Sequence, residues 1–371
     1  MKRARGLFEE VCALETLHLA YLKARKGKLD RSEVAEFTFH LDQELVRLRD
    51  ELSAETYVPG PYRQFVVVES KKRLISAAPF RDRVVHHAVC HVIEPIFERS
   101  FIYDSYACRV GKGQHKAVER FRKFLRSNRY VLKGDVRRYF PSIDHEILRS
   151  LLARKIGDKR LLGLMETIIA HSPCLWSATT PSLHAMTESS HFTSDDPMWF
   201  PGDDLLTPLE RRRGLPIGNQ TSQFFANAML DPLDHFVKEG IRERYYLRYC
   251  DDWVVCGNDK GHLHEVKAAI RTFLEGLRLR LHTDKPQVFP ADQGTDFLGY
   301  RVFPTHMRVR KANVHRFKRQ LRRMQEAYER GEMTWEEVTA SVRSWLAHAA
   351  HADSYRLRRA LMGQAIFVRG G

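Results

Sequence analysis

The stretch "RYYLRYCDDWVVCGND", from Arg244 to Asp259, places two adjacent carboxylates between two apolar runs that have the composition of β-strands. Asp is depleted from strands and neighbouring like charges repel, so Asp251 and Asp252 need a compensating interaction. A bound metal ion would supply one. A solvent-exposed hairpin turn is the alternative interpretation, because Asp is also a common turn residue.

Asp135 is a third carboxylate at the end of a strand-like run, since Tyr130–Leu132 lead towards it. It lies far from the Asp251–Asp252 pair in sequence, but two strands of one sheet can bring such positions together. Carboxylates at neighbouring strand ends would form an all-oxygen site suited to Mg²⁺ or Mn²⁺. Two such ions about 4 Å apart can stabilise both the attacking 3′-hydroxyl and the leaving pyrophosphate of an in-line phosphoryl transfer.

The composition favours a polyanionic partner. Of the 371 residues, 43% are hydrophobic, which suffices for a core and for two or three subdomains. Lys and Arg number 61 against 46 Asp and Glu, which gives a formal net charge of +15. Such an excess points to nucleic acid, with a membrane surface as the weaker alternative.

Neither membrane insertion nor secretion is expected. No apolar stretch approaches the roughly 20 residues that cross a bilayer. Acids interrupt the apolar residues of the N-terminus, which is typical of an amphipathic helix and not of a signal peptide. The six cysteines form no Cys-x-x-Cys pair, so we expect neither a disulfide framework nor a zinc site, and a cytoplasmic protein.

Helical and strand patterns interleave and then give way to helices alone, which predicts an α+β fold with a helical C-terminal appendage. Residues 5–55 are expected to form two helices, the second at 31–52. Four further helices are expected at 82–97, 115–125, 145–156 and 263–277, and another is expected to begin after a cap at Thr221 or Ser222. From residue 313 the chain is expected to be helical throughout, with Trp335 and Trp345 as core anchors. Besides the runs around the Asp pair, strands are expected at 65–68, 73–75, 130–132, 279–281 and 297–303.

The segment 174–208 differs from the rest of the chain. It contains no Lys or Arg, five acids and many Ser, Thr and Pro residues. We therefore expect a long, irregular acidic insertion, and such loops are uncommon in compact domains unless they are functional or mobile.

Several stretches, taken in order, resemble the motifs of reverse transcriptases. Asp135–Ile143 resembles the first catalytic motif of that family, and Tyr249–Asp252 resembles its Tyr-x-Asp-Asp motif. Four further stretches resemble the fingers strand and helix (72–83), the segment that bacterial enzymes of the group II intron type place next (105–115), the lysine motif (281–285) and the primer grip (297–300). The resemblance covers about residues 60–350. It implies a right-hand polymerase fold with an N-terminal helical region at 1–60, fingers and palm at 61–300 and a basic helical thumb at 301–371.

The resemblance also assigns roles to the chemistry-bearing residues. Asp135, Asp251 and Asp252 would hold two Mg²⁺ ions, with Mn²⁺ as a substitute, and Lys285 would protonate pyrophosphate. Phe140 stands where the family has an aromatic steric gate against the ribose 2′-hydroxyl, although core packing is its alternative. The other candidates for nucleotide binding are Lys72, Arg73, Arg81, Arg83, Ile217 and Gly218. Each basic residue has solvated surface charge as its alternative.

Nucleic-acid contacts are expected from the thumb and from the primer grip. Between residues 301 and 330 there are ten Lys and Arg but only two acids. A helix that tracks a template–primer backbone would bind in a salt-dependent way, and a generic solvated helix is the alternative. The candidate residues are Arg109, Gln223, Phe297, Gly299, Arg316, Arg319 and Arg323.

The loop Ile217–Gln223 departs from the common Gln-Gly-x-x-x-Ser-Pro pattern of reverse transcriptases. Its form resembles diversity-generating retroelement enzymes, for which low fidelity at template adenines is implied. The acidic insertion is longer than we expect in that group. Stand-alone defence-associated reverse transcriptases that work with a partner noncoding RNA are the alternative, and both roles stay open.

The predicted activity is RNA-directed DNA synthesis. The expected partners are an RNA template, a DNA primer or product, dNTPs and a dedicated structured RNA, with an accessory protein or a second copy as further candidates and no membrane. A non-catalytic, maturase-like RNA-binding protein that keeps the palm as a scaffold is the rival, and the intact aspartates argue against it. An RNA-templated RNA polymerase is a second rival, which Phe140 disfavours.

Overall fold

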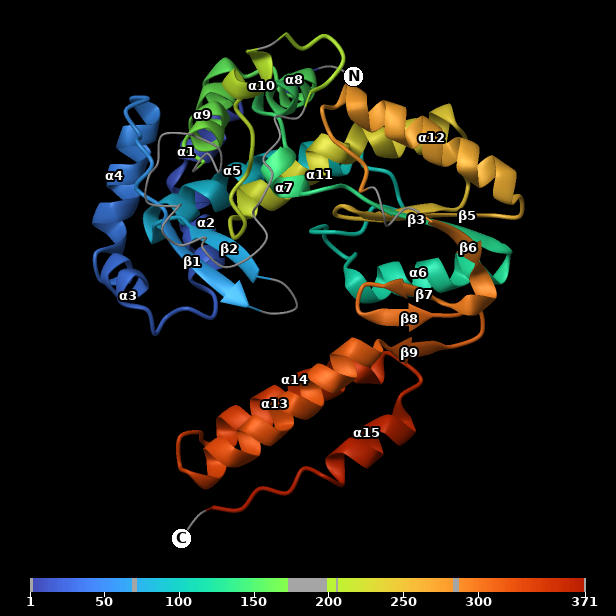
Figure 1. The fold of residues 1–371 in the computed structure, drawn as a ribbon. Coiled ribbons are helices and arrows are strands. Elements are labelled where there is room, and N and C mark those ends of the chain that lie inside the picture. Colours follow the sequence, from blue (N-terminus) through green and yellow to red (C-terminus); the bar gives the residue numbers. More distant parts are fainter. Residues whose placement is uncertain (1–2, 69–71, 173–198, 205, 283–286, 370–371) are drawn as a thin grey trace.

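The computed structural model describes residues 3–68, 72–172, 199–204, 206–282 and 287–369. Figure 1 shows the N-terminal helices beside a two-stranded hairpin, a larger sheet covered by helices, and the C-terminal helices extending away from that sheet. Most of the predicted acidic insertion lies outside the described residues. Within those residues, no helix is long and apolar enough to cross a membrane.

The N-terminal region is helical, but the predicted division into two helices is wrong. Within residues 3–60 the structure has α1 (Phe8–Cys12), α2 (Leu14–Arg25), α3 (Ser32–Phe39) and α4 (Leu41–Ser53). The breaks fall at Ala13 and His40, which leave the helical backbone conformation (ψ of 134° and 28°). Breaks of one residue change the direction of the chain without interrupting the apolar pattern, so the pattern does not reveal them.

The N-terminal helices pack on the first part of the following domain. Helix α2 lies along α5 (Phe80–Glu98), and Tyr21 of α2 stacks on Phe37 of α3 while it meets Phe80 of α5 edge-on. The hairpin of β1 (Arg63–Val68) and β2 (Lys72–Ala77) precedes α5, in agreement with the predicted strands. Leu17 of α2 and Val84 of α5 are fully buried in one common core.

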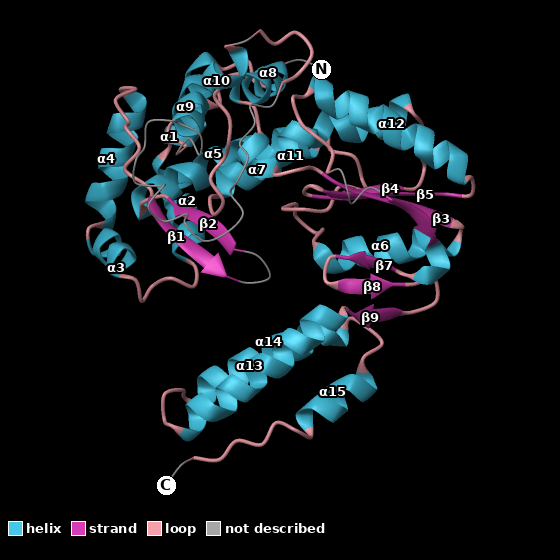
Figure 2. Cartoon of the chain, in the orientation of Figure 1, coloured by secondary structure: helices cyan, strands magenta, loops and turns pink. Residues whose placement is uncertain are grey.

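The central sheet has the described strand order β4-β5-β3-β6 and is antiparallel throughout. Its strands are β3 (Tyr130–Asp135), β4 (Tyr246–Tyr249), β5 (Asp252–Gly257) and β6 (Gln287–Pro290). Figure 2 shows α12 (Lys260–Gly276) on one face and α6 (Gln114–Arg126) on the other. Val255 accordingly packs in one core, whereas Val254 and Cys256 pack in a second core with α6. Burial on both faces explains why these strands are apolar without alternation.

Helices connect the strands of this sheet. Between β3 and β4 lie α7 (Tyr139–Ser142), α8 (His145–Lys155), α9 (Lys159–Ala170), α10 (Thr207–Glu210), α11 (Gln220–His235) and the π-helical turn η2 (Phe236–Gly240). Asp144 and Asp158 cap α8 and α9, because their side chains accept hydrogen bonds from backbone N–H groups of the first turn. The predicted cap at Thr221 or Ser222 is wrong: α11 begins at Gln220, and both hydroxyl residues lie buried inside it.

The last sheet is formed by β7 (Thr295–Phe297), β8 (Tyr300–Val302) and β9 (Met307–Val309), after the short 3₁₀ turn η3 (Ala291–Gln293). The predicted single strand at 297–303 is wrong, because the chain reverses at Leu298 and Gly299, which have φ of +45° and +86°. The predicted strand at 279–281 is also wrong. Only Leu281 forms an isolated bridge there, with Val136.

The C-terminal part consists of α13 (Lys311–Glu329), α14 (Trp335–Ala350) and α15 (Tyr355–Met362), so helix is not continuous from residue 313 as predicted. Thr334 starts α14 with a capping box to Glu337. Trp345 stacks on Phe317 of α13 with ring centroids 4.1 Å apart, as expected of a core anchor. Trp335 is 52% exposed, so its prediction as a second anchor is wrong.

Candidate active site

The opening stretch forms the hairpin of β4 and β5. Tyr249 pairs with Asp252, so Cys250 and Asp251 make the tight connection between the strands. Cys250 has φ of +56°, in the left-handed region that a side chain with a Cβ rarely adopts. Strained positions of this kind persist only where the surrounding structure holds them.

Asp135 lies directly across from Asp252. The two residues are paired positions of the antiparallel strands β3 and β5, so their side chains point to the same face of the sheet. Asp251 is next to them, and its carboxyl group shares a hydrogen bond with that of Asp135. The structure therefore brings the three predicted carboxylates together, although their catalytic role stays a prediction.

The electrostatics of this cluster suit a cation. Burial raises the pKa of Asp251, and the negative charges of Asp135 and Asp252 raise it further, to about 7. Lys133 is the neighbouring positive charge, with its Nζ 3.7 Å from Oδ1 of Asp252 and 2.8 Å from the backbone carbonyl oxygen of Asp296. A divalent cation would relieve the repulsion that disfavours the ionised form of Asp251.

The donor set fits a metal that shares its coordination with substrate. Within the described residues, no three His, Cys, Asp or Glu side chains are arranged to hold a metal by themselves. Asp135 and Asp251 are close enough to share a hydrogen bond. Mg²⁺ is commonly bound through one or two carboxylates, with water and substrate phosphates as its other ligands, so this arrangement is compatible with it.

A glycine on the opposite face of the sheet allows the two strands to approach. Gly134 pairs with Trp253, whose side chain is fully buried and covers the glycine. A Cβ atom at Gly134 would lie 2.0 Å from Cζ2 of the indole. This contact was not predicted; its signal in the sequence is a glycine inside an apolar strand, which marks a close approach.

The segment expected to form a strand at 279–281 instead runs beside the end of β3. Arg137 donates from its backbone N–H to Arg280 O (2.8 Å), and His282 donates from its backbone N–H to Asp135 O (2.9 Å). These two bonds hold residues 280–282 beside the end of β3. Lys285 itself lies outside the described residues, and its proposed proton transfer stays a prediction.

Two candidates for nucleotide binding are held close to the hairpin of β1 and β2. Ile217 O accepts a hydrogen bond from the backbone N–H of Ser76 in β2 (3.1 Å). Gly218 has φ of +127°, and a Cβ there would lie 3.2 Å from Cγ2 of Ile75.

The two basic candidates lie on strand β2. Arg73 is exposed there. Lys72 is the first residue of that strand.

Phe140 packs partly on the core, while its role as a steric gate stays a prediction. Its side chain is half-buried and packs against the main core, with the ring of Tyr139 5.7 Å away. Its carbonyl oxygen accepts a hydrogen bond from the backbone N–H of Leu215 (2.9 Å), which joins α7 to the loop before α11.

Three arginines that were predicted to bind ligands form ion pairs within the fold. Arg81 pairs with Glu51 of α4, and Arg83 contacts the Ala78 carbonyl (2.7 Å) and Glu33 of α3 (3.2 Å). Arg109 is 6% exposed; it pairs with Glu98 and donates to the carbonyls of Ile102 and Ser105. These guanidinium groups therefore have partners within the fold, and their predicted ligand contacts stay predictions.

The predicted nucleic-acid contacts divide into buried and exposed residues. Phe297 is buried and packs on Phe121 of α6 (5.2 Å between ring centroids), so only its backbone stays a candidate. Gly299 forms the turn between β7 and β8, and its carbonyl oxygen accepts a hydrogen bond from the Asn313 side chain (3.1 Å). Exposed side chains occur at Gln223 on α11 and at Arg316, Arg319 and Arg323 on α13.

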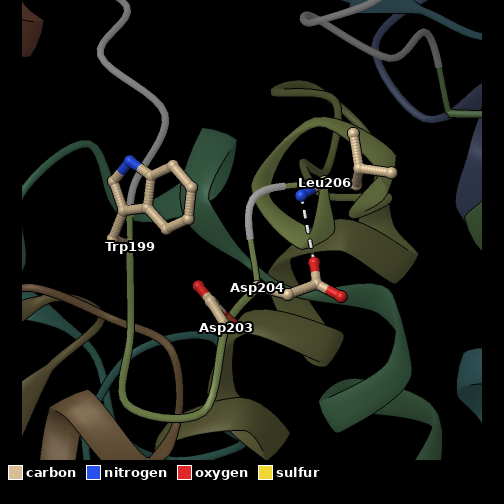
Figure 3. A pocket seen from close by; sticks show the side chains of 4 residues that line it. All are labelled: Trp199, Asp203, Asp204 and Leu206. Carbon is tan, nitrogen blue, oxygen red and sulfur yellow. Dashed lines mark hydrogen bonds between the residues drawn. The ribbon is translucent and has the colours of Figure 1, made fainter.

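None of the candidate residues that the structure describes lines the hollow shown in Figure 3. Trp199, Asp203, Asp204 and Leu206 line it. Asp204 accepts hydrogen bonds from the backbone N–H groups of Leu206 (3.0 Å) and Thr207 (2.8 Å), and Asp203 pairs with Arg211. Both acids therefore stabilise the chain around α10.

A buried ion pair close to the carboxylates was not predicted from the sequence. Arg248 of β4 and Asp234 of α11 are each fully buried and form two hydrogen bonds of 2.7 Å. Arg248 lies in a run that was predicted to be an apolar strand. A charged residue inside such a run is the signal that could have identified the pair, because buried charges are almost always paired.

A helix-covered antiparallel sheet that carries carboxylates at the ends of its central strands, together with a helical thumb, is the right-hand polymerase fold. The chain belongs to the reverse transcriptase family, since the family model "Reverse transcriptase (RNA-dependent DNA polymerase)" matches residues 63–302.

The chain is also similar to individual proteins. The chain is 27% identical over 311 residues to Protein YkfC of Escherichia coli, which covers 73% of this chain and 74% of that protein. It is 22% identical over 326 residues to the group II intron-encoded protein LtrA of Lactococcus lactis, so 74% of this chain spans about half (51%) of LtrA. Among solved structures, telomerase from Candida albicans in complex with a fragment of telomeric RNA aligns with a TM-score of 0.42 and 12% identity, over 71% of this chain and 50% of that one.

Proposed function

We propose that this protein is an active RNA-directed DNA polymerase that adds dNTPs to the 3′-hydroxyl of a primer on an RNA template. The observation that carries the proposal is the pairing of Asp135 with Asp252 across β3 and β5, with Asp251 hydrogen-bonded to Asp135. Three mutually repelling carboxylates are costly in a protein that only binds RNA. Perturbed carboxyl groups of this kind are more typical of a catalytic centre.

In the proposed reaction the three carboxylates orient the reacting groups. Two Mg²⁺ ions, or Mn²⁺, held by Asp135 and Asp251 would supply the positive charge that stabilises the attacking and leaving oxygens. Asp252 contributes negative charge to the same face, and Lys133 limits the local excess. Phe140 is proposed to exclude the ribose 2′-hydroxyl. Lys285 is proposed to donate a proton to pyrophosphate.

The nucleotide is proposed to bind between the loop before α11 and the hairpin of β1 and β2. Ile217 and Gly218 supply the loop backbone, while Lys72 and Arg73 supply positive charge for the triphosphate. The template–primer duplex is proposed to follow the exposed basic face of α13. That face would release counterions on binding, which makes the affinity depend on salt.

Primer extension tests the proposal. An RNA template with an annealed DNA primer, dNTPs and Mg²⁺ should give extended product with the wild-type protein and none with the Asp251→Ala, Asp252→Ala variant. Asp292→Asn, an exposed acid in η3, is the control and should extend normally. Equal product from the wild type and the double variant would reject the proposed site. No product from a folded wild-type protein would reject the polymerase function.

We infer that the setting is a retroelement or phage defence, with a dedicated structured RNA and with an accessory protein or second copy as further candidates. The form of the loop Ile217–Gln223 supports the retroelement, and low fidelity is proposed with it. Sequencing the nucleic acid that copurifies with the protein separates the two: a variable-repeat template supports the retroelement, and a dedicated noncoding RNA supports defence.

The similarity to an intron-encoded protein favours one second candidate, a maturase-like protein that binds RNA without catalysis. Such a protein would bind intron RNA equally well with and without its aspartates and would extend no primer. The primer-extension experiment therefore separates this candidate from the polymerase.

A further inference from the structure

The buried ion pair of Arg248 and Asp234 lies next to the connection between β4 and β5. Both side chains are 0% exposed, and two hydrogen bonds of 2.7 Å join the guanidinium to the carboxylate in fork geometry. The hydroxyl of Tyr246 donates a third hydrogen bond to Asp234 (2.7 Å). An arginine in this geometry has one fixed orientation, unlike a surface arginine.

Stability alone does not account for the pair. A buried ion pair loses the hydration of both charges, and apolar residues of similar volume often stabilise a fold as well or better. Burial by itself would lower the pKa of Arg248, but the charge of Asp234 outweighs this effect and raises the pKa above its usual range. The guanidinium therefore stays protonated, and all of its N–H groups remain donors.

The remaining donors of Arg248 reach the catalytic hairpin. Nη1 donates to the carbonyl oxygen of Cys250 (3.0 Å) and to Oδ1 of Asn227 (3.2 Å). Cys250 is the residue with φ of +56°, and its carbonyl belongs to the peptide group that leads into Asp251. A rotation of that peptide group would move the Asp251 carboxylate away from Asp135. The hydrogen bond to the Cys250 carbonyl opposes this rotation.

The same arginine joins a second segment to the hairpin. Nη2 donates to Oγ of Ser105 (3.3 Å), and the backbone N–H and carbonyl of Arg248 bond to Asp104 and Tyr106 (both 3.0 Å). Asn227 donates to the Ala107 carbonyl (2.7 Å), so α11 holds this segment as well. The hairpin is thus fixed from α11 and from residues 104–107.

We propose that Arg248 and Asp234 act as positioning residues, which hold the Cys250 carbonyl and thereby place the Asp251 carboxylate beside Asp135 for metal binding. This inference rests on the proposed function for its kinetic consequences. Its structural claim concerns only the geometry of the carboxylates.

The test replaces the whole pair by apolar residues, as Arg248→Met with Asp234→Leu. The variant should fold, because neither charge is left alone, but with a lower unfolding temperature, because the Tyr246 hydroxyl and the Cys250 carbonyl lose these hydrogen-bond partners. Its kcat for primer extension should fall at least tenfold, with little change in KM for dNTP. The affinity for Mn²⁺, measured by electron paramagnetic resonance without nucleotide, should also fall at least tenfold.

A matched control lies one helical turn earlier on α11. Asp231 forms a largely buried ion pair with Lys155 (2.6 Å), whose side chain is 18% exposed. The double change Asp231→Leu with Lys155→Met should retain wild-type kcat and Mn²⁺ affinity. Loss of both properties in this control as well would show that any buried pair has the same effect, and would overturn the proposal.

A second variant covers the case in which the apolar pair does not fold. Arg248→Lys keeps the positive charge next to Asp234 but loses the fork that reaches the Cys250 carbonyl, and it should show the same loss of kcat and Mn²⁺ affinity. Wild-type values in any folded variant at Arg248 would overturn the proposal. If the wild-type protein bound Mn²⁺ but extended no primer, the proposed function would fail, while the Mn²⁺ comparison would still decide the positioning role.

Discussion

In the protein without divalent ions, the Asp251→Asn variant measures how much the repulsion among the three carboxylates lowers the free energy of unfolding. Burial and the charges of Asp135 and Asp252 raise the pKa of Asp251 to about 7, whereas the unfolded chain ionises it near the ordinary value of 3.8. Above pH 7 the folded protein therefore carries an ionised carboxylate in unfavourable surroundings. An asparagine removes that charge and keeps the shape, so the variant should be more stable than the wild type and inactive.

The magnitude follows from the two pKa values. A difference from 3.8 to about 7 corresponds to about 4 kcal/mol of unfolding free energy in favour of a neutral side chain. We expect about 2 kcal/mol, because the amide must also replace the hydrogen bond that the carboxyl group makes with Asp135.

The sign of the pH dependence follows from proton binding. Between pH 4 and 7 the folded state keeps a proton that the unfolded state has lost, so the stability of the wild type falls as the pH rises through this window. The advantage of the variant should be complete above pH 7 and should disappear as the pH falls from 7 to 4.

Thermal unfolding in EDTA, followed by circular dichroism at pH 8.5 and pH 5, measures this advantage. Addition of Mg²⁺ at pH 8.5 should stabilise the wild type more than the variant and narrow the difference between them. Asp292→Asn is the matched control and should unfold like the wild type at both pH values. A variant that is no more stable than the wild type at pH 8.5 would show that repulsion among the three carboxylates is not the dominant effect.

Three further predictions concern the palm, the nucleotide site and the thumb. Gly134→Ala should lower the unfolding free energy by about 3 kcal/mol, the upper range for overpacking, because the new Cβ would collide with Trp253. The control is Gly163→Ala on α9, where a Cβ would meet no other atom, and it should not lower the unfolding free energy in the same denaturant titration. Phe140→Ala should raise the ratio of rNTP to dNTP incorporation by about tenfold or more, and an unchanged ratio would remove it as the steric gate. Arg316, Arg319 and Arg323 of the thumb should together determine part of the salt dependence of binding to an RNA–DNA duplex. When all three become glutamine, the slope of log affinity against log salt concentration should decrease in magnitude by roughly 2 to 3. The slope should not change in an Arg47→Gln control on α4.

The sequence predicted the parts of the site that depend on motifs and on strand ends. Asp135 and the Asp251–Asp252 pair were placed on neighbouring strands, and the structure has them there. The strands β3 to β5 and the helices α5, α6, α8 and α12 agree with the apolar patterns, because long periodic segments follow from burial alone, whereas β6 was not predicted. The family was identified from the same residues.

The sequence could not predict features that depend on tertiary contacts. The sequence around Arg81 and Arg83 does not show that they form ion pairs with acids of the N-terminal helices. An arginine on the surface and an arginine in an ion pair have the same local sequence pattern. The turn at Leu298 and Gly299 divides a run that is apolar throughout. Arg248 and Asp234 are 14 residues apart, and only the packing of α11 under β4 brings them together.

Template-dictated incorporation of a single nucleotide tests the central claim most directly. Four RNA templates that differ only in the base after the primer should each direct the wild-type protein to add the complementary dNMP in Mg²⁺. The Asp251→Ala, Asp252→Ala variant, folded to the same extent by circular dichroism, should add none. Incorporation by that variant at the wild-type rate, or none by the wild-type protein on any template, would contradict the assignment of Asp135, Asp251 and Asp252 as a polymerase centre.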